Sequence, residues 1–206
     1  LLEFNPILPD SYKNSEYLLL GNIDPNLQLK VIEQMTTRPK LIVLDTMNFW
    51  MDIMMDKLKE VIAKVDVLTI NDSEARQLSG EYSLVKASKK IMEMGPKYLI
   101  IKKGENGALL FHENHIFFAP ALPLEEVFDP TGAGDTFAGG FIGFLAKSGD
   151  ITFENMKRAI IYGSAMASFC VEKFGTERLK ELDIDEIHDR VEEFVSLSQF
   201  DIDIEE

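Results

Sequence analysis

The chain has 206 residues, of which 46% are hydrophobic and 27% charged, a composition that fits a globular protein and excludes a disordered or fibrous chain. Its 35 acidic and 21 basic side chains give a net charge of −14, so we expect neither nucleic acid nor an anionic membrane surface as a partner. Cys170 is the only cysteine, and no apolar run approaches the roughly 20 residues of a membrane span, which favours a cytoplasmic protein without disulfides.

The first half of the chain alternates short apolar runs with longer helix-like patterns. The runs predicted as strands are 17–20, 41–44, 65–70 and 98–101, and the segments predicted as helices are 25–36, 52–64, 72–79 and 83–94. Continuous apolar strands separated by helices indicate a parallel sheet that is covered on both faces. Right-handed crossovers place the carboxyl ends of such strands along one edge, where open α/β sheets bind ligands.

The alternation stops after residue 103. Residues 108–111 and 116–119 are β-like runs separated by a short polar stretch, which predicts an antiparallel hairpin. The remaining predicted elements are long apolar helices over 134–147 and 153–172, an amphipathic helix over 183–198 and an acidic tail over 201–206. We therefore expect residues 1–206 to form a single α/β domain, with a doubly wound, mostly parallel sheet flanked by helices and a hairpin at its edge.

The segment FDPTGAGD, residues 128–135, leads into the first long helix. Amides of Gly132, Ala133 and Gly134 would converge at the positive end of the helix dipole and hold an anion without a basic side chain. Asp135 beside them is placed to accept a proton from a hydroxyl that attacks a bound phosphoryl group. An ordinary glycine-rich loop, in which Asp135 only complements the dipole, explains these four residues equally well.

Three glycines inside the following helix favour the first interpretation. Gly139, Gly140 and Gly143 each cost about 1 kcal/mol relative to Ala in a helix interior, so a compensating gain is needed. Tight backbone packing is the compensation that we expect at these positions.

The sequence DPTGAGDTFAGGF, residues 129–141, resembles the C-terminal signature of the PfkB/ribokinase family of carbohydrate and nucleoside kinases. The resemblance implies a ribokinase-like fold, with ATP and Mg²⁺ as cofactors. It makes Asp135 the base that deprotonates the acceptor hydroxyl, and residues 132–134 the anion hole. Asp129 and Thr131 fall where relatives often contribute to a monovalent-cation site, such as one for K⁺, although the residue between them is here Pro in place of a commoner Thr.

Asn71 and Glu74 follow the third predicted strand and match the family's N-x-x-E motif. By that resemblance they help to place Mg²⁺ and the phosphates, with Glu74 acting on the metal through water. We expect Mg²⁺ because transfer of a γ-phosphoryl group requires charge neutralisation. Capping of the next helix by Asn71 is the alternative, since Asn, Asp and Ser all cap helices well.

The turn KKGENGA, residues 102–108, resembles the family's nucleotide-binding turn of form x-x-G-x-x-G. Gly104 and Gly107 would let the backbone run close to ATP, and Lys102 stands where relatives often have Thr. A plain hairpin turn is the alternative, because glycines are also frequent in such turns.

Residues 164–175 match the helix and turn that lie near the adenine in the family. The resemblance adds Ser164 and Gly175 to the nucleotide site, although a buried helix that ends at a Gly explains the pattern equally well. Asp45 and Asn48 lie near the place of a D-x-N motif at the substrate edge, with a spacing one residue longer.

The resemblance runs in the family's order and covers the C-terminal two thirds of such an enzyme. The family's sugar-binding N-terminal part and its lid, through which relatives commonly dimerise, are not visible before Leu1. The resemblance implies a kinase that transfers the γ-phosphoryl group of ATP to a sugar or nucleoside, and allows a homodimer. The alternative is a non-catalytic nucleotide-binding or regulatory module with the same fold.

Overall fold

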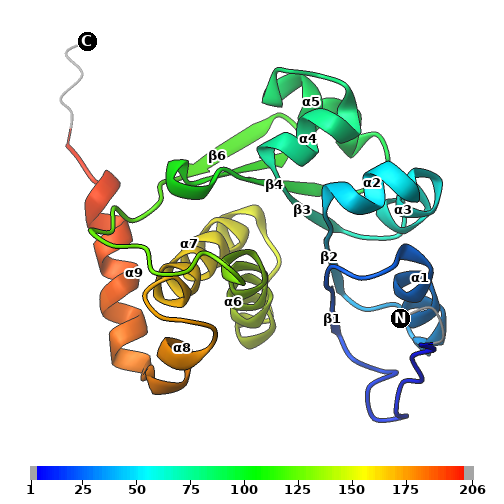
Figure 1. Ribbon diagram of the computed structural model, residues 1–206, viewed down its shortest axis with the longest axis horizontal. Helices are drawn as coiled ribbons and strands as arrows, with labels where there is room; N and C mark the ends of the chain where they lie inside the picture. Colours follow the sequence, from blue (N-terminus) through cyan, green and yellow to red (C-terminus); the bar gives the residue numbers. More distant parts are fainter. Residues whose placement is uncertain (1–3, 202–206) are drawn as a thin grey trace.

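A computed structural model describes residues 4–201 of the chain, and in it six strands form one sheet in the order β1-β2-β3-β4-β5-β6 (Figure 1). The parallel strands are β1 (Tyr17–Leu20), β2 (Leu41–Asp45), β3 (Val67–Asn71) and β4 (Tyr98–Lys102). The antiparallel strands at one edge are β5 (Ala108–His112) and β6 (His115–Ala119). The predicted mostly parallel sheet with an edge hairpin is confirmed.

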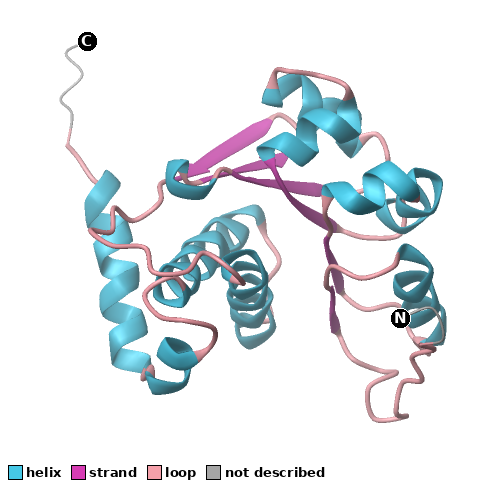
Figure 2. Cartoon of the chain, viewed as in Figure 1, coloured by secondary structure: helices cyan, strands magenta, loops and turns pink. Residues whose placement is uncertain are grey.

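Helices cover both faces of the sheet, as Figure 2 shows. One face carries α1 (Pro25–Gln34), α2 (Asn48–Ile53), α3 (Met55–Ile62), α4 (Asp72–Ser79) and α5 (Leu84–Met92). The other face carries α6 (Ala133–Ser148) and α7 (Phe153–Cys170), with α8 (Glu177–Glu181) and α9 (Ile184–Ser198) packed beside α7. Within the part of the chain that the structure describes, no helix is long and apolar enough to cross a membrane.

The central strands are buried on both sides, which explains their unbroken apolar sequences. In β2, Ile42 and Leu44 enter the core under α1–α5, while Leu41 and Val43 enter the core under α6 and α7. Side chains alternate along a strand, so a strand between two helical layers needs apolar residues at every position. The carboxyl ends of β2, β3 and β4 then lie side by side at one edge.

The structure departs from the predicted elements in several places. The helix predicted over 52–64 is two helices, because Met54 (φ −142°, ψ 35°) leaves the helical region and ends α2. The third strand begins at Val67 because the preceding Asp66 binds Arg38 and the Ile42 amide with its carboxylate. Helix α8 was not predicted, and most of the predicted acidic tail lies outside the described residues.

The crossing of α6 and α7 depends on two glycines. A Cβ on Gly140 would lie 2.9 Å from Met166 Cγ and 3.2 Å from the Gly163 Cα, so the two helices approach with their backbones. The prediction of tight packing is confirmed at Gly140. It is wrong at Gly139 and Gly143, where a Cβ would meet nothing within 4 Å.

Candidate active site

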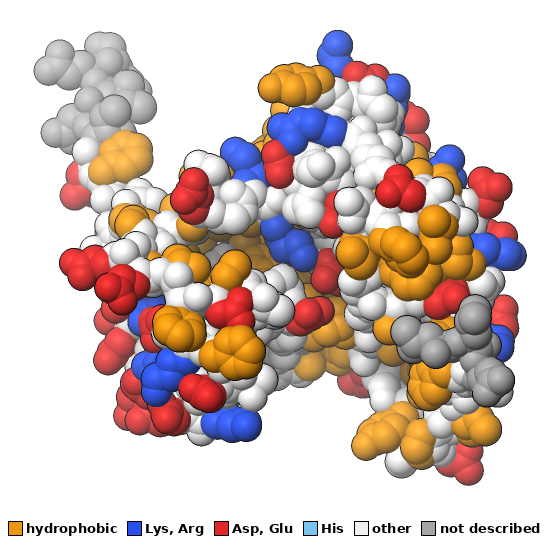
Figure 3. All heavy atoms as spheres, viewed as in Figure 1, with side chains coloured by type: hydrophobic (Ala, Val, Ile, Leu, Met, Phe, Trp, Pro, Cys, Tyr) orange, Lys and Arg blue, Asp and Glu red, His pale blue; other side chains and the backbone are white. Residues whose placement is uncertain are grey.

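A cleft of about 970 Å³ lies at the carboxyl edge of β3 and β4. Its walls come from the β4–β5 turn, the segment between β6 and α6, and helices α6, α7 and α9. Figure 3 shows the face hollowed at its centre, with Lys or Arg atoms beside the hollow. Sites for small molecules commonly measure about 300–1,000 Å³, so a nucleotide-sized ligand fits here.

The cleft brings together predicted site residues that lie far apart in the sequence. Those that line it are Asn71, Lys102, Gly104, Gly107, Ala133, Gly134 and Ser164. Asp135 is exposed next to Gly134, at the first turn of α6. The predicted site residues that do not line it are Asp135, Gly132, Thr131, Asp129, Glu74 and Gly175.

Several backbone amides at the start of α6 are free in the described part of the chain. Gly132 precedes it with φ 83°, a left-handed conformation that favours glycine. The amides of Gly132, Gly134 and Asp135 have no hydrogen-bond partner among residues 4–201. The prediction that Ala133 also offers a free amide is wrong, because that amide donates to the Pro130 carbonyl at 3.2 Å and closes a turn.

A partly buried ion pair lies at the same place. Lys102 Nζ lies 2.9 Å from Asp45 Oδ1, with side-chain exposures of 20% and 9%. The same oxygen accepts a 2.8 Å hydrogen bond from Thr69 Oγ1. A Cβ on Gly134 would lie 3.3 Å from Lys102 Nζ, so the ammonium stands against the first turn of α6. A basic side chain therefore adds to the positive end of the helix dipole.

Asn71 and Glu74 form a capping box at the start of α4, as the capping alternative predicts. Asn71 Oδ1 accepts from the Glu74 amide and Glu74 Oε2 accepts from the Asn71 amide, each at 2.8 Å. Burial raises the pKa of the Glu74 carboxyl, and the Asn71 amide and the Lys102 charge oppose that rise. Asn71 still lines the cleft, while Glu74 lies buried behind it.

The acidic residues near the cleft fit a Mg²⁺ ion that is held mainly by phosphate. Among the described residues, no three His, Cys, Asp or Glu side chains gather closely enough to hold a metal themselves. Glu74 keeps Oε1 outside the capping box, and Asp45 is engaged by Lys102. Mg²⁺ usually keeps several waters and binds one or two carboxylates together with substrate phosphates, so this donor set suits it.

The geometry of the turn between β4 and β5 requires its two glycines. Gly104 and Gly107 have φ 56° and 78°, and a Cβ on Gly107 would lie 2.1 Å from the Ala119 carbonyl oxygen. Any side chain at Gly107 would therefore push β6 away. This is the geometry of the plain-turn alternative, and both glycines also line the cleft.

Asp129 and Thr131 form a local turn outside the cleft. The Thr131 amide donates to Asp129 Oδ1 at 2.9 Å, and this hydrogen bond lowers the pKa of the Asp129 carboxyl. The Asp129 amide donates to the Val171 carbonyl, which ties the loop to the end of α7. Gly175 lies in the turn after α7 with φ 60°, where a glycine explains the backbone without a ligand.

Part of the cleft wall is apolar, and of the residues after α6 the sequence indicated only Ser164. The apolar side chains of this part, here called the apolar end, are Ala121, Leu122, Pro123, Leu124, Val127, Ala167, Val171 and Phe194. They come from the β6–α6 segment, α7 and α9, which are brought together only by the fold. An apolar end next to an anion-binding end suits a ligand that joins a ring to phosphates.

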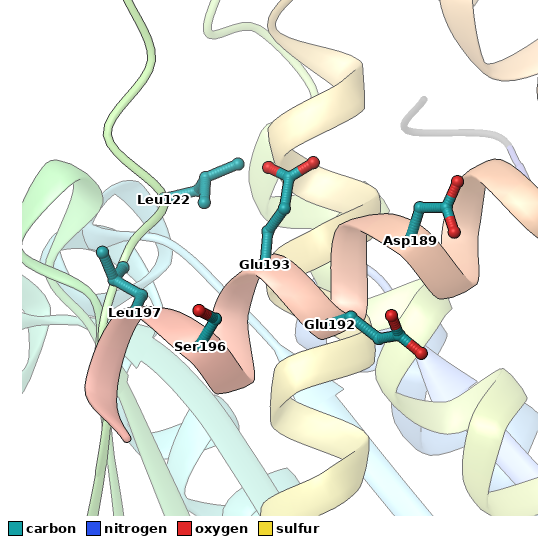
Figure 4. Close-up of a pocket in the computed structure, with 6 residues that line it drawn as sticks. All are labelled: Leu122, Asp189, Glu192, Glu193, Ser196 and Leu197. Atoms are coloured by element: carbon teal, nitrogen blue, oxygen red, sulfur yellow. The ribbon is translucent and has the colours of Figure 1, made fainter. Parts of the chain in front are cut away.

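A second, shallower pocket of about 580 Å³ lies between α9 and the β6–α6 segment (Figure 4). Three of its six lining side chains are the carboxylates Asp189, Glu192 and Glu193. No basic residue lines it, so it repels anions rather than binding them. We therefore place the candidate site in the larger cleft.

Comparisons with known proteins find relatives of this chain. The sequence model for pfkB family carbohydrate kinases matches residues 10–182. The cytidine kinase of Thermococcus kodakarensis is 31% identical over 140 residues, which cover 66% of this chain and 49% of that protein. The nucleoside kinase of Methanothermobacter thermautotrophicus is 27% identical over 168 residues, which cover 82% of this chain and 52% of that protein. The chain thus spans about half the length of these curated relatives.

Solved structures share the fold. A ribokinase from Thermotoga maritima superposes with a TM-score of 0.68 at 27% identity, over 86% of this chain and 57% of that one. A nucleoside kinase from Methanocaldococcus jannaschii gives a TM-score of 0.72 at 24% identity, over 93% of this chain and 59% of that one. The predicted ribokinase-like α/β fold is therefore confirmed.

Proposed function

This chain belongs to the pfkB family of carbohydrate kinases, and from that premise we propose that it carries the nucleotide site and the catalytic base of an ATP-dependent kinase. The proposed reaction transfers the γ-phosphoryl group of ATP to a hydroxyl of a sugar or nucleoside. Relatives named as cytidine kinase, nucleoside kinase and ribokinase support this acceptor class.

The observation that carries the proposal is the meeting of three groups at the first turn of α6. These are the free amides of Gly134 and Asp135, the exposed Asp135 carboxylate and the Lys102 ammonium. The amides and the ammonium would stabilise the negative charge on the phosphoryl group. A carboxylate beside that group is where a base must be to take the proton of the attacking hydroxyl.

The rest of the cleft would orient the nucleotide. The apolar end near Ser164 would receive the base, and the glycines of the β4–β5 turn would lie along the sugar and phosphates. Bound Mg²⁺ would neutralise phosphate charge, with Asn71 and Glu74 beside it. Burial of Glu74 behind Asn71 supports a contact through water rather than direct ligation.

Two measurements on the protein test this proposal. Calorimetry with ATP and Mg²⁺ should detect binding to residues 1–206. ADP formation should then depend on an acceptor, in a panel of hexoses, pentoses and nucleosides tested with this chain and with any longer gene product that contains it. Nucleotide binding without acceptor-dependent ADP formation would support the alternative, a nucleotide-binding module that does not transfer phosphate. No nucleotide binding at all would contradict both.

A further inference from the structure

The Asp45–Lys102 ion pair is partly buried, which costs desolvation free energy, and its geometry offers a reason for that cost. The Asp45 side chain is 9% exposed, and its Oδ1 accepts both from Lys102 Nζ and from the fully buried Thr69. Buried ion pairs are often replaceable by apolar residues without loss of stability, because desolvation offsets the attraction. Stability alone therefore does not account for this arrangement.

The three residues fix the position of one ammonium group. A free lysine side chain has about 2 kcal/mol of rotamer entropy, so its charge is spread over many positions. Thr69 lies opposite Asp45 in the sheet and holds its carboxylate, which in turn holds Lys102. The chain of contacts runs from β3 to β2 to β4, so the charge is held by three neighbouring strands of the sheet.

The ammonium retains donors for a ligand. Of its three N–H groups, one donates to Asp45, and Lys102 makes no other side-chain hydrogen bond within residues 4–201. It lies against Gly134, whose amide is free at the positive end of α6. An anion bound by these amides would contact Lys102 as well. Under the proposed function, the anion held there beside Asp135 is the phosphoryl group that is transferred.

We propose that Asp45 and Thr69 are positioning residues that hold the Lys102 ammonium on the phosphoryl group being transferred. This inference rests on the proposed kinase function and assigns to Lys102 the terminal phosphate of the donor. It gives Asp45 a role towards Lys102 rather than towards the acceptor, because the Asp45 carboxylate binds Lys102 and Thr69.

Asp66 provides a matched control. It is also a buried aspartate, 6% exposed, and it also pairs with a cation, Arg38. It precedes β3, however, and so lies at the opposite end of the strands from Asp45, which ends β2. Lengthening either side chain by one methylene keeps the charge and shifts the carboxylate, but only Asp45→Glu should displace Lys102.

The test measures the affinities of two Mg²⁺-bound probes, the non-hydrolysable triphosphate AMP-PNP and ADP, by calorimetry. Lys102→Met should lower the affinity for AMP-PNP by about 10- to 100-fold, which is the loss expected for a charge-assisted hydrogen bond. The affinity for ADP should fall far less. Asp45→Glu and Thr69→Val should lower the AMP-PNP to ADP affinity ratio in the same direction by a smaller factor. Thr69→Ser, which keeps the hydroxyl, should restore the ratio, and Asp66→Glu should leave it unchanged.

The outcomes separate this inference from the proposed function. If wild type binds AMP-PNP but the ratio is unchanged in Lys102→Met, the inference is overturned and the kinase proposal stands. A ratio changed in Lys102→Met but not in folded Asp45→Glu or Thr69→Val would overturn the positioning role. If wild type binds neither probe, both proposals fail. Because Thr69→Val alters no charge, this variant tests the positioning role even if Asp45→Glu does not fold.

Discussion

Lys102 and Gly134 meet where β4 ends and α6 begins: a Cβ added to Gly134 would lie 3.3 Å from Lys102 Nζ. Neither strand nor helix alone creates this site. The strand supplies a fixed positive charge, the helix supplies unpaired amides, and the absence of a side chain at Gly134 lets the two face the same space.

Gly134→Ala should weaken nucleotide binding without weakening the fold. Gly134 does not have a positive φ, and Ala is favoured over Gly in helices by up to about 1 kcal/mol, so stability should be unchanged or raised. The new methyl group would crowd Lys102 and the free amides, so calorimetry should find a lower affinity for AMP-PNP. Gly139→Ala, in open space further along α6, should keep the affinity. Equal affinity in both variants would contradict an anion site at Gly134.

Gly140→Ala should destabilise the protein, because its methyl group would overlap Met166 and approach the Gly163 backbone. Overpacking of a well-packed core typically costs about 1–3 kcal/mol. Gly143→Ala in the same helix meets nothing within 4 Å and should raise stability by up to about 1 kcal/mol. Urea unfolding of the two variants measures both effects. Equal midpoints would show that α6 does not approach α7 as closely as described.

Glu74→Gln should alter the pH dependence of stability. Burial raises the pKa of this carboxyl above its ordinary value of 4.5, so the folded state holds the proton more tightly than the unfolded state. The stabilising contribution of the protonated group is therefore complete below the unfolded pKa and is lost as the pH rises through the folded pKa. Gln keeps an oxygen for the Asn71 amide and does not titrate.

Stability of wild type relative to Glu74→Gln should accordingly fall as the pH rises from about 4 towards 7, as linkage requires. Urea unfolding at several pH values measures the difference. Glu177→Gln, at an exposed position at the start of α8, is the control. If wild type instead gained stability relative to Glu74→Gln over this range, the raised pKa would be contradicted.

The strands of the sheet could be predicted well because each is recognised from its own residues. Apolar runs such as β2 need only their own residues to be recognised, and the Gly-Asp segment carries its own turn and helix start. Capping of α4 by Asn71 was also among the alternatives, since the capping residue directly precedes its helix.

Contacts between distant residues could not be predicted in the same way. Lys102 and Asp45 are 57 positions apart, and nothing near either residue indicates the other. The apolar end of the cleft is likewise built from three segments that are separated in the sequence. The prediction of a free Ala133 amide was wrong for a different reason. The turn over residues 130–133 closes its own hydrogen bond from that amide, which the glycine pattern alone did not indicate.

The role of Asp135 is the central claim, and Asp135→Asn tests it most directly. The measurement is acceptor-dependent ADP formation by the gene product, alongside AMP-PNP affinity, with Asp189→Asn on the exposed side of α9 as the control. Loss of a general base should lower turnover by about 10²- to 10⁴-fold while affinity is not reduced. Turnover in Asp135→Asn equal to that of wild type would contradict the assignment of the base.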